Sequence, residues 1–248
     1  PPSIIKAIYA TGYSAGNNKK LTQLLDLIDT TEINSLVIDI KDFSGIVTYN
    51  TDIRAVEAAK AEEKRIPRIN ALVKMLHDKG VYIIGRIAVF EDQKLALARP
   101  DLALKSKKTG ELWTTKRGLY WMDTASEEVW DYNIALARDI LSRGFDEVNF
   151  DYIRFASDGD LRDIEYPVWD GKTSRRSVLK NFYKHLRSEL PTAKISADLF
   201  GMVTTNSDDL GIGQVIEDAL PYFDAVSPMV YPSHYVSGFL NLKNPAQF

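Results

Sequence analysis

The chain has 248 residues, of which 45% are apolar and 26% are charged, and its formal net charge is −3 at pH 7. This small net charge gives no general attraction to nucleic acid or to an anionic membrane. The absence of cysteine excludes a disulfide scaffold, a thiolate metal site and a cysteine nucleophile. The length fits one α/β barrel or two smaller domains, and because no repeat or low-complexity linker divides the chain, we expect one domain over residues 1–248.

The chain carries no targeting or membrane signal. No apolar run reaches transmembrane length, and no signal peptide is present. Residue 1 is proline rather than methionine, so we expect a processed product or a trimmed domain from which any anchor or export signal has been removed.

Six apolar runs have the character of β-strands, and helical patterns separate most of them. The predicted strands are Ile4–Ala10, Ser35–Asp42, Val81–Phe90, Glu147–Phe155, Lys194–Met202 and Ala225–Tyr231. The predicted helices lie within residues 21–28, 67–80, 124–144 and 174–190. Gly80 and Gly144 are placed to end two of these helices. The alternation indicates a parallel sheet covered by helices.

Two architectures remain open, a TIM-type (β/α)8 barrel and an open flavodoxin-like sheet. No glycine-rich dinucleotide motif or Walker motif follows any predicted strand, so a nucleotide-binding fold has no support. A closed barrel needs two more strand–helix units after Tyr231. For a barrel we therefore expect that the native chain continues beyond Phe248 or that segments are missing from this sequence.

The fourth predicted strand carries polar residues within an apolar run. Side chains alternate along a strand, so Asn149, Asp151 and Ile153 share one face. A carboxylate in so apolar a strand is costly to bury unless it is paired, solvated or used in chemistry. Asp151 is therefore either a structural group that caps a neighbouring loop or a functional carboxylate.

Polar and charged residues also stand near the ends of the other predicted strands. In α/β barrels the active site lies at the C-terminal ends of the strands, so we expect these side chains to converge on one mouth. The candidate residues are Asp39, Arg86, Asp151, Arg154, Asp198, Tyr231 and His234.

Converging carboxylates flanked by aromatic residues indicate hydrolysis of a glycosidic bond. One carboxylic acid protonates the leaving oxygen, and a second carboxylate acts as nucleophile or base. Asp151 and Asp198 lie on consecutive predicted strands, and neighbouring strands of a sheet are roughly 4.8 Å apart. We therefore assign these two residues as the catalytic pair and leave open which of them is the acid. We assign Asp39, Arg86, Arg154, Tyr231 and His234 to substrate binding. The alternative for each arginine is a buried ion pair without a role in binding.

The segment Pro100–Asp123 supplies two further candidates. A loop of this length is uncommon in a compact domain and is often functional. Trp113 and Trp121 are predicted to stack on pyranose faces, the alternative being that one of them plugs the barrel core. The chain has no zinc or calcium motif, so no metal and no cofactor are expected.

Five segments carry a family resemblance: Ile38–Asp42, Pro100–Asp123, Trp130–Asn133, Phe145–Phe155 and Ser227–Tyr235. They resemble a bacterial family of glycoside hydrolase domains that was first catalogued as a domain of unknown function. The resemblance implies a TIM-type (β/α)8 barrel, incomplete here at its C-terminal end, a carbohydrate substrate, and an extracytoplasmic or cell-surface location, often with a membrane anchor outside the domain. Chitinase-type barrels are a more distant likeness, and their substrate-assisted catalysis is not expected here, because Ile153 stands where their acid glutamate would be.

The sequence therefore predicts a glycoside hydrolase that acts on a bacterial cell-surface or extracellular polysaccharide. The rival hypothesis is a non-catalytic glycan-binding barrel domain, which would bind oligosaccharides without cleaving them. A barrel enzyme with a non-sugar substrate is a third possibility, since a fold does not dictate function. The expected partner is carbohydrate, with neither nucleic acid nor membrane contact, and no oligomeric state is predicted.

Overall fold

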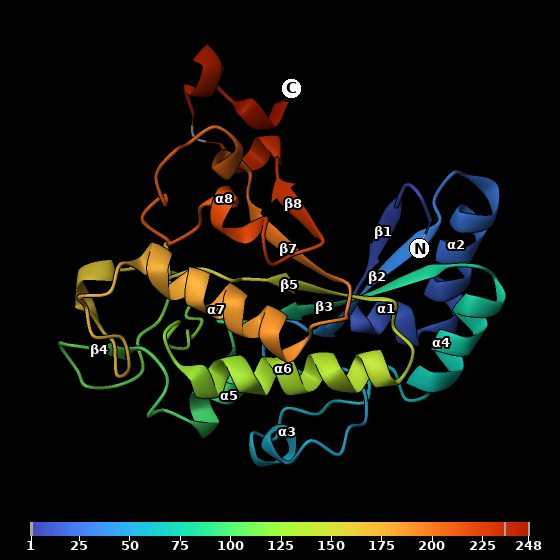
Figure 1. The fold of residues 1–248 in the computed structure, drawn as a ribbon, viewed down its shortest axis with the longest axis horizontal. Helices are drawn as coiled ribbons and strands as arrows, with labels where there is room; N and C mark the ends of the chain where they lie inside the picture. The colour runs from blue at the N-terminus through green and yellow to red at the C-terminus, as the bar shows by residue number, and fades with distance from the viewer. Residues whose placement is uncertain (1, 236, 248) are drawn as a thin grey trace.

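A parallel sheet forms the centre of the molecule. The structure, a computed structural model, describes residues 2–235 and 237–247. Its main sheet has six parallel strands in the order β1-β2-β3-β5-β7-β8 (Figure 1). These strands are β1 (Ala7–Ala10), β2 (Ser35–Lys41), β3 (Tyr82–Ala88), β5 (Glu147–Asp151), β7 (Ile195–Phe200) and β8 (Ala225–Met229). Each falls within one predicted apolar run, so the prediction of a parallel sheet with helical connections is confirmed.

Helices connect most of the strands and cover one face of the sheet. They are α1 (Gly12–Gly16), α2 (Asn18–Thr30), α3 (Arg54–Ala58), α4 (Ile69–Asp78), α5 (Gln93–Ala98), α6 (Glu127–Ser142), α7 (Arg175–Glu189) and α8 (Ile216–Ala219). Ser126 begins α6 by accepting a hydrogen bond from the Val129 N–H at 3.3 Å, two residues after the predicted start at Thr124. None of the helices in the described residues is both long and apolar enough to cross a membrane.

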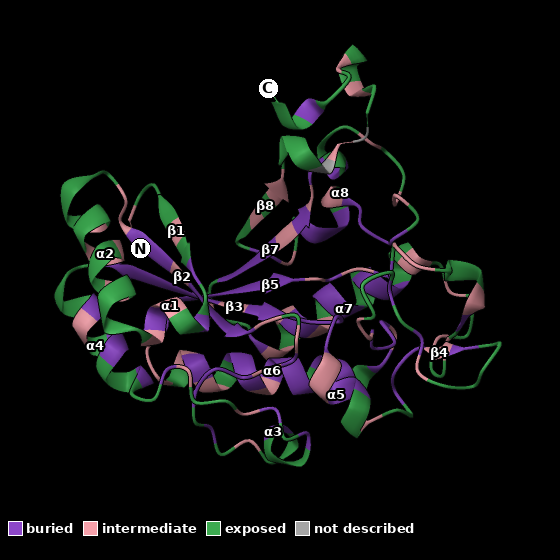
Figure 2. Ribbon diagram, turned by 180° about the vertical axis from the view of Figure 1, so that it is seen from behind, coloured by how far each residue is buried: buried purple, intermediate pink, exposed green. Residues whose placement is uncertain are grey.

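The helices pack closely on the central strands. Helix α6 contacts β3, β5 and α7, and Figure 1 draws α6 and α7 side by side in front of the sheet. Gly85 of β3 allows this approach, since a Cβ atom there would lie 2.3 Å from the Cδ1 atom of Ile140. Every residue of β5 is buried, whereas β1 and β8 are partly exposed (Figure 2). The core therefore lies between the middle of the sheet and its helical layer.

The sheet is curled, but it is not a closed barrel. In the described part of the chain β1 and β8 each pair with one strand only, so both are edges. A cavity of about 380 Å³ on the concave side is lined from both edges, by Tyr9 of β1 and Met229 of β8 among others. The predicted (β/α)8 barrel is thus found as a curled half-barrel of six strands, and an eight-stranded closure is not formed by these residues.

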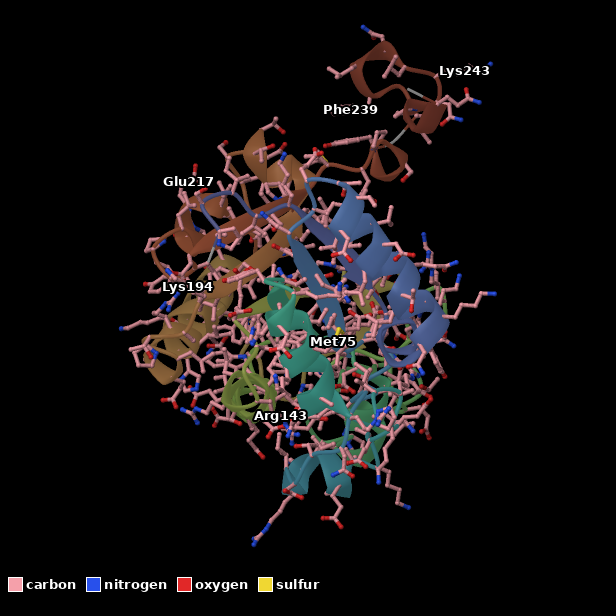
Figure 3. All side chains as sticks on the ribbon, turned by 90° about the vertical axis from the view of Figure 1, so that its right-hand side faces the viewer. Met75, Arg143, Lys194, Glu217, Phe239 and Lys243 are labelled. Carbon is pink, nitrogen blue, oxygen red and sulfur yellow. The ribbon has the colours of Figure 1, made fainter. Side chains whose placement is uncertain are left out.

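Two smaller structures lie outside the main sheet. Strands β4 (Lys105–Ser106) and β6 (Ile164–Glu165) form an antiparallel pair that joins two long loops. Short 3-10 turns complete the described structure: η1 (Leu161–Asp163), η2 (Gly201–Thr204), η3 (Pro232–His234), η4 (Phe239–Asn241) and η5 (Pro245–Gln247). The last of these belong to a C-terminal segment, with Phe239 and Lys243, that projects from the body (Figure 3).

A buried ion pair ties the end of β2 to α5. The Nζ atom of Lys41 lies 2.6 Å from Oδ2 of Asp92, and both side chains are fully buried. Asp92 also caps α5, because its Oδ1 accepts a hydrogen bond from the Leu95 N–H at 2.8 Å. The pair satisfies two charges that would each be costly to bury alone.

Candidate active site

One arginine gathers three carboxylates on the concave side of the sheet. Arg86 of β3 donates a hydrogen bond from Nη1 to Oδ1 of Asp39 at 2.7 Å and another from Nη2 to Oδ2 of Asp151. Its Nε atom lies 3.9 Å from Oδ2 of Asp198. These carboxylates come from β2, β5 and β7, so residues far apart in the sequence meet at a single guanidinium.

Asp151 and Asp198 are neighbours at the carboxyl ends of β5 and β7. Phe150 pairs with Ala197 in the parallel register, so Asp151 and Asp198 are the next residues along the two strands. Because both carboxylates also approach Arg86, they lie less than roughly 9 Å apart, below the upper limit of about 9.5 Å for the catalytic pairs of glycosidases. The structure thus brings together the two predicted carboxylates, and their catalytic role stays a prediction.

The two carboxylates have different surroundings. Burial, and after it the charge of Asp151, raise the pKa of Asp198 to about 6, while a hydrogen bond from Asn149 opposes the rise. That bond runs from Nδ2 of Asn149 to Oδ1 of Asp198 at 3.0 Å. Asp151 instead accepts from the guanidinium of Arg86 and, at 2.6 Å, from the Tyr152 N–H. Asp198 is therefore suited to hold a proton, whereas Asp151 is paired with a guanidinium.

This environment predicts a pH-dependent change in stability when Asp198 is replaced by asparagine. The pKa of Asp198 is about 6 in the folded protein but about 3.9 in an unfolded chain. The folded state binds the proton more tightly, so the contribution of this carboxyl to stability is lost as pH rises through about 6. We expect Asp198→Asn to be more stable than wild type by about 1–3 kcal/mol above pH 6 and nearly equal to it below pH 4. Urea unfolding at pH 4 and pH 7.5 checks this, and an equal difference at both pH values would contradict it.

Asp39 has a second partner that the sequence analysis missed. The hydroxyl of Tyr9, on edge strand β1, donates a hydrogen bond to Oδ2 of Asp39. Burial raises the pKa of Asp39, and the charge of Arg86 opposes that effect. Tyr9 lies near the end of the first predicted strand, and its hydroxyl group, a polar group at a strand end, is the signal that could have marked it as a site residue.

The strand that carries Asp151 ends sooner than predicted. Tyr152 has a φ of 54°, in the left-handed region, so the alternation of faces expected as far as Ile153 and Phe155 is broken after Asp151. The ring of Tyr152 lies 6.0 Å from Cζ of Arg86 and 5.8 Å from Cζ of Arg154. A strained non-glycine residue of this kind is typical of functional sites. Tyr152 was not among the predicted site residues.

Arg154 reaches the same region from the segment after β5. Its Nη1 atom donates hydrogen bonds to the Phe155 carbonyl at 3.1 Å and to Oγ of Ser157 at 2.8 Å. It lines a cavity of about 420 Å³ together with Asp151 and Tyr152. Arg154 therefore belongs to the surroundings of the predicted catalytic pair.

The prediction for Trp113 and Trp121 is wrong, because neither ring is available to a sugar. Trp121 is fully buried, and Trp113 is 3% exposed and donates from Nε1 to the Asp160 carbonyl at 3.0 Å. The loop that carries them folds against residues 156–173 through the β4–β6 pair instead of lying open at the mouth. Trp121 packs against Arg154, whose Cζ atom is 4.6 Å from its ring, so it supports the site from below the surface.

The last two predicted residues follow β8. Tyr231 is 56% exposed and lines the concave cavity with Arg86 and Asp198. His234 ends η3, and its side chain lies outside the described residues.

Glu91, which follows β3, was not among the assigned site residues. It is 6% exposed, and burial raises its pKa to about 7, with the charge of Arg154 opposing the rise. Its position directly after the third predicted strand, and directly before the capping residue Asp92, is the signal that could have marked it. Among the described residues, no group of three histidine, aspartate or glutamate side chains is arranged to hold a metal ion.

A curled parallel sheet with acidic residues at the carboxyl ends of its strands is the arrangement of α/β-barrel enzymes, whose active sites lie at that edge of the sheet. Residues 7–248 match the family model described as "Putative glycosyl hydrolase domain", and the chain belongs to this family. The crystal structure of a hypothetical protein from Ruminiclostridium thermocellum is similar, with 32% sequence identity and a TM-score of 0.72 over 83% of this chain and 98% of that one.

Two glycosidase structures share the fold at lower identity. The alpha-galactosidase from Thermus thermophilus in complex with stachyose has 18% identity and a TM-score of 0.56, over 91% of this chain and 44% of that chain. Alpha-L-fucosidase isoenzyme 2 from Paenibacillus thiaminolyticus has 14% identity and a TM-score of 0.57, over 83% of this chain and 34% of that chain. The chain thus spans less than half of either enzyme, and the likeness concerns the fold alone. No curated protein matches the chain.

Proposed function

We propose that the chain is a glycoside hydrolase that cleaves a bacterial cell-surface or extracellular polysaccharide, and that it works outside the cytoplasmic membrane. The observation that carries the proposal is the pair Asp151 and Asp198, which share Arg86 at the carboxyl ends of adjacent strands. Membership of a glycosyl hydrolase family and the glycosidase fold support it.

The surroundings of the pair assign a role to each carboxylate. Asp198 is the general acid, since its raised pKa keeps it protonated to about pH 6, and it delivers its proton to the glycosidic oxygen. Asp151, which accepts hydrogen bonds from Arg86 and the Tyr152 N–H, acts on the anomeric carbon either directly or by deprotonating a water. Tyr231, which lines the concave cavity with Asp198, binds a sugar hydroxyl group, and the buried Asp39 orients Arg86 through their ion pair.

The acid role predicts how the rate depends on pH. Because Asp198 must be protonated to act, kcat/KM is expected to fall with increasing pH, with an apparent pKa near 6. The measurement is a pH–rate profile on a hydrolysed polysaccharide. Rates that stay constant from pH 5 to pH 8 would remove Asp198 from this role.

A screen of purified cell-wall, capsular and exopolysaccharides tests the proposal. Release of new reducing ends is followed for wild type, for the double variant Asp151→Asn/Asp198→Asn, and for Asp26→Asn as a control at an exposed position of α2. We expect release by wild type and by the control but not by the double variant. Polysaccharides that bind to wild type and are never cleaved would favour the non-catalytic glycan-binding alternative.

A further inference from the structure

Arg154 differs from Arg86 in having no carboxylate partner. Within residues 2–235 and 237–247, no aspartate or glutamate oxygen lies within 4.0 Å of its guanidinium nitrogens, whereas Arg86 has three such carboxylates. Its side-chain hydrogen bonds within the described residues, to Phe155 and Ser157, use only Nη1. In the described structure, Nε and Nη2 therefore keep their donors for another group.

Aromatic rings hold this guanidinium in a fixed place. Its Cζ atom lies 4.6 Å from the ring of Trp121, 5.0 Å from that of Phe200 and 5.8 Å from that of Tyr152. Contact with aromatic faces orients an arginine without neutralising its charge. The side chain is thus positioned in advance, and its charge remains available.

Arg154 lines a cavity large enough for a sugar residue. The cavity of about 420 Å³ is lined by Arg154 and Asp151, with Phe200, Met229 and Tyr235 on its other sides. This volume is within the usual range of about 300–1,000 Å³ for ligand pockets. A ligand in the cavity would contact Arg154 and the proposed nucleophile or base at the same time.

The charge of Arg154 is only partly balanced by its surroundings. Burial lowers the pKa of Arg154, and the charge of Glu91 is the largest effect in the opposite direction, ahead of those of Asp151 and Asp158. Asp151 is already bound by Arg86. A ligand anion on Arg154 would relieve the cost of this partly desolvated cation.

We propose that the site recognises an acidic glycan, and that Arg154 binds the carboxylate of a uronic acid residue next to the scissile bond. The planar edge formed by Nε and Nη2 matches a carboxylate, which it can bind through two parallel hydrogen bonds. The proposal rests on the proposed function, since it places the uronic acid beside Asp151. It narrows the substrate to the acidic members of the bacterial polysaccharides.

A binding experiment with paired ligands tests this inference. Oligosaccharides that contain glucuronate, galacturonate or mannuronate are titrated into the Asp198→Asn variant by calorimetry, each beside its methyl ester, in which a methyl group replaces the negative charge. We expect at least one acid to bind roughly tenfold or more tightly than its ester. The inference is overturned if none of the acids binds more tightly than its own ester, including the case in which neither binds.

Variants then test whether Arg154 is the residue that causes the preference for the acid over its ester. Arg154→Gln is expected to abolish the acid-over-ester preference, and Arg154→Lys to retain part of it, because lysine keeps the charge but not the planar fork. The matched control is Arg175→Gln, since Arg175 also stacks on two rings, Phe155 and Trp169, but is not among the residues that line this cavity. A preference that survives in Arg154→Gln, or that is lost in the control, would contradict the assignment.

Two further results separate this inference from the proposed function. Cleavage of neutral polysaccharides, with no preference for acids, would refute the acidic substrate and leave the hydrolase intact. Tight binding of an acid that wild type never cleaves would refute the hydrolase and leave the role of Arg154 intact. If Arg154→Gln does not fold, as judged by its thermal transition, the comparison of acid and ester in the Asp198→Asn variant alone decides whether the site prefers an acidic glycan.

Discussion

Replacing Asp151 with asparagine is expected to lower kcat by roughly 10²–10⁴-fold on any polysaccharide that wild type cleaves. The amide keeps the size of the carboxylate and can still accept the Tyr152 N–H, so the local backbone is preserved. It loses the negative charge that lies against Arg86 and that would act on the anomeric carbon. The measurement is kcat from reducing-end release under saturating substrate.

The control for this variant is Asp26→Asn, the same change at an exposed position of α2. Its kcat is expected to equal that of wild type. If Asp151→Asn keeps a kcat within a few-fold of wild type while both variants are folded, Asp151 is neither the nucleophile nor the base.

Replacing Lys41 with methionine is expected to destabilise the fold by about 3–5 kcal/mol. The change leaves Asp92 fully buried and without its countercharge, at a position where the same carboxylate caps α5. The double variant Lys41→Met/Asp92→Asn is expected to recover part of the loss, because asparagine can still cap the helix without a buried charge. Urea unfolding at pH 7 gives the three free energies.

An exposed pair provides the comparison. Lys74 and Asp78 form an i,i+4 ion pair on α4 with side chains 76% and 62% exposed. Removing it by Lys74→Met is expected to cost no more than about 0.5 kcal/mol. A loss in Lys41→Met that is as small as the loss in Lys74→Met would contradict the importance of the buried pair.

The residues at strand ends explain why much of the site was predictable. In a parallel sheet every strand presents its carboxyl end at the same edge, so Asp39, Asp151 and Asp198 were expected to meet from their positions alone. Their meeting with Arg86 follows from the register of the strands, and it is what the structure contains. Periodicity likewise located the six strands and the main helices.

The parts that were not predictable depend on contacts between distant segments. The sequence cannot distinguish Trp113 and Trp121 from tryptophans that stack on sugars. Both are buried because their loop packs on residues 156–173. The left-handed Tyr152 has no sequence signal, because an aromatic residue in an apolar run predicts continued strand. The six strands were predicted, and so was a barrel incomplete at its C-terminal end, but strand patterns do not determine how far such a sheet closes.

A crystal structure of the Asp151→Asn variant with a bound oligosaccharide from a cleaved polysaccharide is the most direct test of the proposed chemistry. We predict that a glycosidic oxygen lies about 3 Å from a carboxyl oxygen of Asp198, with the anomeric carbon facing residue 151. A glycan bound on the helical face, or one whose glycosidic oxygens are all beyond hydrogen-bond reach of Asp198, would contradict the assignment of this pair.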